Sequence, residues 1–183
     1  KLIIIASAAL ILLPAVYFFF FEYQDCSFGE RILLSLFQSV SPRTAGFNTS
    51  DLTKFTDSGI TLMIVLMLIG GASGSTAGGM KVSTFAILLA SANSVFHRKK
   101  HVTVLKRRIT DDIVKNAAAI AVMYVTLFLF IGMSISIVEG ISLKDCLFET
   151  ASAIATVGLT LGITPSLSIV SKILLIALMY AGR

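Results

Sequence analysis

The sequence predicts an all-α integral membrane protein that contains two copies of one structural unit. Of its 183 residues 56% are hydrophobic, and the mean hydropathy is +0.91, well above that of soluble domains. Uncharged runs such as Leu2–Phe21 have the roughly 20 residues that a helix needs to cross a bilayer. The pattern Thr-x-Gly occurs at 44–46 and at 156–158, each time after a short helical stretch and before a long apolar one. We therefore expect the unit helix, short helix, loop, helix to occur twice.

The first unit is expected to occupy residues 1–98. Its first helix covers Leu2–Phe21, with a kink at Pro14, where proline removes a backbone donor. Ile32–Val40 is apolar but too short to cross the membrane, and the following Ser41-Pro42 disfavours further helix. A short helix that enters the membrane and returns as a loop is typical of a pore helix. Its C-terminal dipole end favours a cation by up to about 1 kcal/mol.

A glycine-rich segment, residues 70–79, interrupts the apolar stretch from Ser58 to Phe96, which would be nearly twice a bilayer's thickness as one helix. Each glycine costs a helix about 1 kcal/mol relative to alanine, so we expect a broken helix here. The spacing lacks the Gly-Lys-Ser/Thr of a phosphate loop, whereas small-xxx-small helix packing stays open as an alternative. We favour a mobile intramembrane gating loop beneath the ion path. Its residues are Gly70, Gly71, Ala72, Ser73, Gly74, Ser75, Thr76, Ala77, Gly78 and Gly79.

The basic segment 99–110 links the two units, and the formal net charge of the chain is +5. Clusters of lysine and arginine between two membrane spans are typical of cytoplasmic loops. We therefore place residues 97–108 in the cytoplasm and expect no nucleic-acid partner, while a role in binding lipid headgroups or a protein stays open. His97 and His101 have i, i+4 spacing but no carboxylate beside them within the loop. We expect solvated histidines, no catalytic residue and no enzymatic activity.

The second unit is expected to occupy residues 111–183. Its long helix covers Ile113–Val138, and its short helix covers Ser142–Ala153, with Ser142 as the N-cap. Leu167–Tyr180 begins a last apolar helix after the second Thr-x-Gly loop. Arg183 follows this helix at membrane depth, where an arginine is costly and usually functional.

The two Thr-x-Gly loops carry the predicted chemistry. Threonine offers a hydroxyl and a carbonyl, and glycine can adopt the positive φ that turns successive carbonyls the same way. A ring of such carbonyls can replace the water shell of a monovalent cation, as in potassium-channel filters. A ring needs about four loops, so we expect the others to come from sequence outside this chain or from further copies. The candidate ion-binding residues are Thr44, Ala45, Gly46, Phe47, Thr156, Val157, Gly158 and Leu159.

Several polar and thiol side chains near these loops have two interpretations. Glu149 occupies the position in the second short helix that Gln38 occupies in the first. It could draw cations inward or relay protons, but we favour hydrogen bonding that supports the loop from behind. Arg43 would repel cations unless it turns away to pair with an acid. Cys26 and Cys146 stand at different offsets from the two loops, and we expect two buried thiols rather than a disulfide.

Three ordered motifs resemble the Trk/Ktr/HKT superfamily of potassium transporters, and KtrB-type membrane subunits in particular. They are Ser41–Thr49, Gly70–Lys81 and Thr156–Pro165, and the resemblance covers essentially the whole chain. It implies four repeats of M1, pore helix, filter loop and M2 in one polypeptide. Residues 1–98 then match the third repeat, and residues 111–183 match the fourth with its M2 helix cut short.

The resemblance also assigns roles to residues. It implies that Gly46 and Gly158 are filter glycines, that 70–79 is the intramembrane gating loop, and that Arg183 is the basic residue near this loop. Members of the family take up potassium across the bacterial plasma membrane, work as homodimers and bind a cytosolic nucleotide-binding ring of the KtrA type. The implied ion is K+, with Na+ as a stimulating ion in some members, and no organic cofactor is implied.

An alternating-access secondary transporter with broken helices is the main alternative function. Such transporters often contain inverted repeats. Both units in this sequence run in the same direction relative to the basic segment, which favours a channel-like path.

Overall fold

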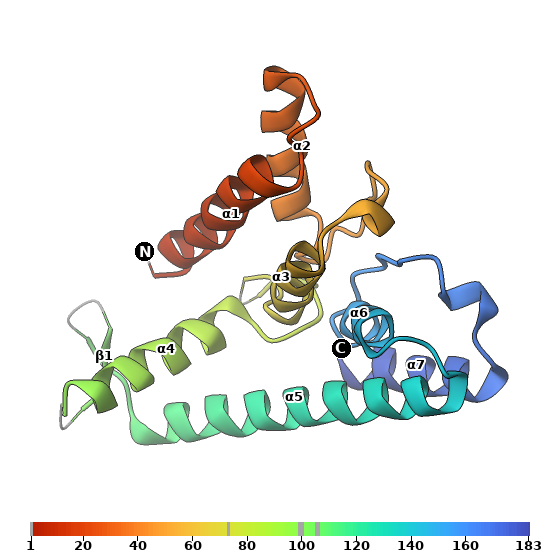
Figure 1. The fold of residues 1–183 in the computed structure, drawn as a ribbon. Helices are drawn as coiled ribbons and strands as arrows, with labels where there is room; N and C mark the ends of the chain where they lie inside the picture. Colours follow the sequence, from red (N-terminus) through yellow and green to blue (C-terminus); the bar gives the residue numbers. More distant parts are fainter. Residues whose placement is uncertain (1, 73, 99–100, 105–106) are drawn as a thin grey trace.

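The computed structural model describes residues 2–72, 74–98, 101–104 and 107–183, and most of them are helical (Figure 1). Two helices, Ile3–Phe21 and Asp111–Glu139, have the length and composition of membrane spans. The elements in chain order are α1 (Leu2–Phe21), α2 (Phe28–Val40), the 3-10 helix η1 (Leu52–Lys54), α3 (Asp57–Leu68), α4 (Val82–Phe96), β1 (Thr103–Val104), β2 (Arg107–Arg108), α5 (Asp111–Glu139), α6 (Leu143–Ile154), the 3-10 helix η2 (Thr164–Ser166) and α7 (Ile169–Ala181).

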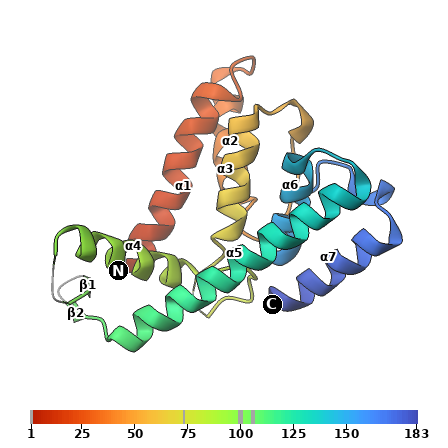
Figure 2. The ribbon, with the colours of Figure 1, turned by 60° about the horizontal axis from the view of Figure 1, so that its bottom comes forward.

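Helices α3 and α6 lie side by side at the centre and join the two halves of the chain (Figure 1). Met63 and Met67 of α3 and Phe148 and Ile154 of α6 are fully buried in one apolar cluster. Because lipid is as apolar as these side chains, close van der Waals packing holds such helices together. Helix α5 runs along α6 and α7 and also reaches α4, while the β1–β2 hairpin and the start of α7 lie on opposite sides of the molecule (Figure 2).

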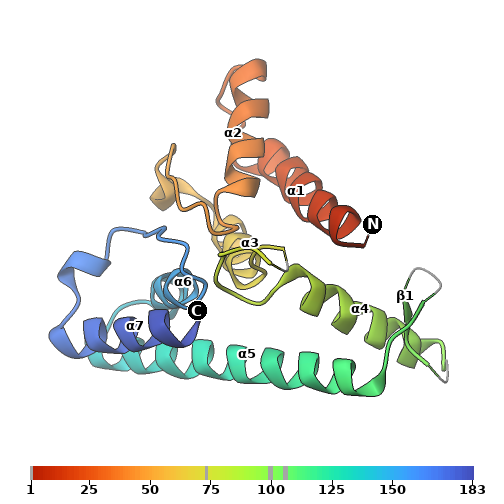
Figure 3. The same cartoon turned by 180° about the vertical axis from the view of Figure 1, so that it is seen from behind.

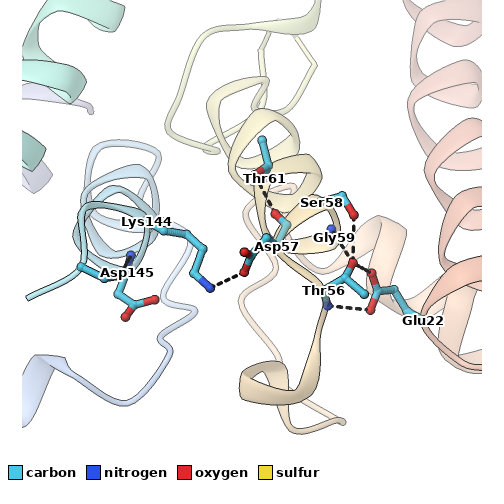
Figure 4. A network of polar contacts seen from close by, with 9 residues as sticks. Glu22, Thr56, Asp57, Ser58, Gly59, Thr61, Lys144 and Asp145 are labelled. Carbon is cyan, nitrogen blue, oxygen red and sulfur yellow. Dashed lines mark hydrogen bonds and ion pairs between the residues drawn. The ribbon is translucent and has the colours of Figure 1, made fainter.

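A network of polar contacts ties the ends of α1, α3 and α6 together (Figure 4). Glu22 accepts hydrogen bonds from the backbone N (3.1 Å) and Oγ1 (2.5 Å) of Thr56, the N-cap of α3. Glycine at position 59 leaves room for this carboxylate, since a Cβ there would lie 2.2 Å from Glu22 Oε1. Lys144 Nζ lies 2.6 Å from Asp57 Oδ1, and this hydrogen bond raises the pKa of Lys144. Such exposed ion pairs contribute about 1 kcal/mol or less.

The predicted helix boundaries can be compared with those of the structure. Helix α2 ends at Val40, before Ser41-Pro42, and Ser142 caps α6 by accepting a hydrogen bond from the backbone N of Asp145, as predicted. Helix α2 begins at Phe28, four residues before the predicted Ile32, because Ser27 supplies the extended N-cap conformation and Glu30 suits the first turn.

The basic segment contains a short antiparallel ladder that the sequence analysis treated as loop. Thr103 pairs with Arg108 and Val104 pairs with Arg107. The β-branched residues Thr103 and Val104 favour strand conformation, but two residues are too few to give a periodic sequence signal.

Candidate ion-binding loops

The first Thr-x-Gly loop leaves α2 through a tight turn. The backbone N atoms of Ala45 and Gly46 donate to Ser41 O at 3.2 and 3.0 Å. Ser41 Oγ donates to Phe47 O and closes the turn from the other side. Thr44 and Gly46 both have positive φ, +68° and +74°. A positive φ is uncommon outside glycine, and in this loop it occurs at two alternate residues, one of which is a threonine.

The second loop repeats this geometry after α6. Thr156 and Gly158 have φ of +53° and +94°. Val157 N donates to Ser152 O at 2.9 Å, and Gly158 N donates to Ser152 Oγ at 3.1 Å. A serine at the end of each short helix therefore anchors its loop, Ser41 in the first and Ser152 in the second.

The two loops are in backbone contact with each other. A Cβ on Gly46 would lie 1.9 Å from Val157 O and 3.0 Å from Val157 C, so no side chain fits at this position. Around Gly158 no heavy atom of the described residues lies within 4 Å of the place of a Cβ, so among these residues the constraint on position 158 is its φ. Glycine is thus needed at the two predicted filter positions for different physical reasons. Gly46 is required by contact and by conformation, and Gly158 by conformation alone.

A cavity of about 570 Å³ lies along the second loop. Its lining includes the loop residues 156–160, Met179 of α7, and Arg183. The predicted second filter loop and Arg183 therefore face one space. Residues 44–47 of the first loop do not line this cavity.

Glu149 lines the same cavity and holds the segment that follows the loop. The side chain is 5% exposed, and its Oε1 accepts from Thr160 Oγ1 at 2.5 Å and from Leu161 N at 3.0 Å. Its Oε2 accepts from Thr164 Oγ1 at 2.6 Å. Of the two interpretations given to Glu149, these contacts match the supporting role. A carboxylate that accepts three hydrogen bonds also remains well satisfied where it is buried.

The twin position, Gln38, has a different environment. Its Nε2 lies 3.2 Å from Met63 Sδ, and its buried Oε1 finds no hydrogen-bond partner among the described residues. Arg43 Nη1 donates to the backbone carbonyl of Ser7 at 3.4 Å rather than to an acid. The acceptor thus belongs to α1.

The glycine-rich segment 70–79 is a closed loop rather than an extended linker. Gly70 N donates to Met80 O (2.8 Å), Met80 N to Leu68 O (3.2 Å), and Val82 N to Gly71 O (3.1 Å), so backbone bonds close its base. Ser73, one of the predicted gating residues, lies outside the described residues. Seen from behind, the loop passes next to α6 (Figure 3).

The loop packs directly against the second Thr-x-Gly loop. A Cβ on Gly78 would lie 2.3 Å from Thr156 Oγ1 and 2.7 Å from Ala155 O. Lys81 Nζ donates to Ala77 O at 2.5 Å and to Ser75 O at 3.1 Å. The resemblance implies that Arg183 lies near this loop, but among the described residues the cationic side chain that binds it is Lys81.

The C-terminal end of α6 has its carbonyls engaged. Tyr124 of α5, which is 8% exposed, donates from its hydroxyl to Ile154 O at 2.8 Å. A Cβ on Gly182 would lie 1.8 Å from the same oxygen, so α7 also packs closely against this end. Neither residue was predicted, because a lone tyrosine in an apolar helix carries no signal for such a contact.

Comparison with known proteins decides the family. The family model for TrkH, a cation transport protein, matches residues 1–183. This chain belongs to the TrkH family. The resemblance to Trk/Ktr transporters predicted from the three motifs is thereby confirmed.

Relatives of this TrkH-family chain include potassium uptake proteins. The Ktr system potassium uptake protein B of Vibrio alginolyticus is 44% identical over 155 residues, which are 85% of this chain and 34% of that protein. The potassium/sodium uptake protein NtpJ of Enterococcus hirae is 38% identical over 161 residues, which are 86% and 36% of the two chains. The chain thus spans about a third of the length of these relatives.

A solved structure supports the fold. The potassium transporter TrkH from Vibrio parahaemolyticus matches with a TM-score of 0.80 and 22% sequence identity, over 97% of this chain and 41% of the other. At this identity the match shows the helical fold alone. Together with the two apolar helices of spanning length, membership of the family implies a membrane protein.

Glu149 offers a stability test in this TrkH-family chain. We expect Glu149→Gln to lower the free energy of unfolding by about 2 kcal/mol, because hydrogen bonds to a charged group contribute about 1.5–3 kcal/mol and an amide has only one oxygen to accept them. Thermal unfolding of the full-length protein in detergent measures this. An unchanged midpoint for Glu149→Gln would show that the three contacts to Glu149 do not stabilise the fold.

Proposed function

We propose that this chain supplies two of the filter loops that line a path for potassium uptake across the bacterial plasma membrane. The observation that carries the proposal is the backbone contact between the two loops. Each loop has a positive φ at its threonine and at its glycine, namely Thr44 and Gly46 in the first loop and Thr156 and Gly158 in the second. Carbonyls set in this way can take the place of the water around a monovalent cation. The names of the relatives, a potassium uptake protein and a potassium/sodium uptake protein, support K+ as the ion.

The proposed unit occurs twice, as residues 1–98 and 111–183, with 99–110 as a cytoplasmic basic loop. Each unit contains a long helix, a short pore helix, a filter loop and an apolar helix, and in the first unit the last helix is broken into α3 and α4. The remaining filter loops come from further repeats of the same protein, since the chain covers only about a third of the length of its relatives. By resemblance the full protein is a homodimer in lipid that binds a cytosolic nucleotide-binding ring of the KtrA type.

The ion loses its water shell to the carbonyls of Thr44–Phe47 and Thr156–Leu159. One glycine per loop leaves fewer ordered sites than the longer filters of potassium channels, so we expect modest discrimination against Na+. Below the filter, the loop 70–79 closes the path together with Arg183. The cytosolic ring shifts the balance between closed and open forms by binding one of them better. Na+ is the second ion to test as a stimulator, and no organic cofactor takes part.

An alternating-access transporter is the second candidate, and one observation favours it. The chain leaves helix between Leu68 and Val82, and broken helices form the substrate sites of many secondary transporters. The parallel order of the two units favours the channel-like path instead.

Rubidium uptake tests the proposed function. The full-length protein is expressed in a bacterial host that lacks potassium uptake, and uptake is recorded with and without excess sodium. We expect Gly158→Ser to lower the preference for rubidium over sodium about tenfold, since a positive φ costs serine about 1–2 kcal/mol and a tenfold change corresponds to about 1.4 kcal/mol. Unchanged selectivity would overturn the filter assignment. An expressed and folded parent without rubidium uptake would favour the alternating-access transporter and another substrate.

A further inference from the structure

Lys81, the N-cap residue of α4, folds back onto the loop that precedes it. Its ammonium donates to the carbonyls of Ala77 (2.5 Å) and Ser75 (3.1 Å). An ammonium has three donors and no acceptor, so a pair of backbone oxygens suits it. Hydrogen bonds from a charged donor are also roughly twice as strong as neutral ones. Lys81 is therefore a strong internal contact of the loop, beside the backbone bonds at its base.

This contact bears on the part of the loop that touches the second filter loop. Ala77, whose carbonyl Lys81 binds, is followed by Gly78, and Gly78 packs against Thr156 Oγ1 and Ala155 O with no room for a Cβ. Fixing the carbonyl of Ala77 thus fixes the peptide that places Gly78. Ser75 and Thr76 at the tip of the loop are exposed.

The chemistry of the contact is that of a bound monovalent cation. Backbone carbonyls bind K+ in filters, and here two carbonyls bind an ammonium of the same charge. The side chain acts as a tethered cation that satisfies the loop carbonyls and adds a positive charge next to the proposed ion path. Both effects oppose the passage of a free cation while the loop is in place.

We propose that Lys81 is a positioning residue that latches loop 70–79 against the second filter loop, so that the path opens only when its ammonium leaves Ser75 and Ala77. The inference rests on the proposed function and adds the bond that must break for opening. A cytosolic partner that favours the open form must offset this contact.

Two measurements on the full-length protein test the latch. The first is rubidium influx into proteoliposomes without any cytosolic partner. We expect Lys81→Met to raise influx about tenfold with the preference for rubidium over sodium unchanged, because Lys81 donates to Ser75 O and Ala77 O rather than to a residue of either filter loop. Lys81→Arg keeps a cationic donor and should retain parental influx. Damage to the fold would lower influx rather than raise it.

The second measurement is amide hydrogen exchange of the loop base in detergent, which does not depend on transport. The amides of Gly70, Met80 and Val82 should exchange several-fold faster in Lys81→Met, while those of α1 remain parental. Lys81→Gln replaces Lys81→Met if the latter does not accumulate in the membrane.

Lys172→Met is the matched control, since Lys172 Nζ also donates to a backbone carbonyl, that of Pro165 at 3.0 Å, but away from the loop. Parental influx and exchange in the neutral Lys81 variant, or an equal rise of influx in Lys172→Met, would overturn the latch. A parent without rubidium influx contradicts the proposed function, and faster exchange at the loop base would then still support the latch.

Discussion

Replacing Gly46 by alanine is expected to abolish selective rubidium uptake, with a loss of about 100-fold or more, whereas Gly158→Ala should lower it only about tenfold. Both alanines must adopt a positive φ, which costs about 1–2 kcal/mol. Only the alanine at 46 also meets a fixed backbone atom, since its Cβ would lie 1.9 Å from Val157 O. To relieve this contact one loop must move away from the other. The carbonyls that both loops present to the ion then move as well.

The measurement compares the two variants side by side, by rubidium uptake at equal membrane abundance of the full-length protein. Gly29→Ala is a control for the loss of a glycine, because a Cβ there has no heavy atom within 4 Å and Gly29 lies in the first turn of α2. Equal effects of Gly46→Ala and Gly158→Ala would mean that conformation alone decides both positions. The contact between the two loops would then have no effect on rubidium uptake.

The difference between Gly46 and Gly158 shows what could and could not be predicted from the sequence. The positive φ at Gly46 and Gly158 follows from residue type and repeat register, which are local properties. The end of α2 before Ser41-Pro42 and the cap at Ser142 are local in the same sense, and both are confirmed. The contact of Gly46 with Val157 joins residues far apart in the chain, so no pattern within either loop contains it.

The contacts that sequence reasoning missed are likewise long-range or made by a single atom. Tyr124 reaches Ile154 O from a different helix, and its hydroxyl is one polar group in an apolar stretch. Lys81 is the last residue of a recognised motif, but its residue type alone predicts a solvated side chain or a topology signal. Arg183 was the more prominent candidate because an isolated charge after an apolar helix is conspicuous. Side-chain direction, which decided between Lys81 and Arg183, depends on how α4 leaves the loop.

Removing the tip of the glycine-rich loop, residues 74–76, is expected to raise rubidium influx about tenfold in the absence of a cytosolic partner, since a shift of about 1.4 kcal/mol in the closed–open balance gives that factor. The deletion shortens the segment that packs under Thr156. It also removes Ser75, one of the two carbonyl partners of Lys81. The backbone bonds that close the base, Gly70 to Met80 and Val82 to Gly71, lie outside the deleted residues, so α3 and α4 keep their connection.

A double variant, Ser75→Ala with Thr76→Ala, distinguishes two possibilities: the backbone of the loop blocks the path, or the hydroxyls of the loop bind the ion as it passes. Both side chains are exposed, and their removal keeps the length of the loop and both carbonyls that Lys81 binds. If the loop blocks the path by its backbone, this variant has parental influx while the deletion has raised influx. If the hydroxyls bind the ion during passage, the double variant lowers influx. A deletion that lowers influx or leaves it unchanged contradicts the gate, because removing a barrier from a path cannot slow the ions that cross it.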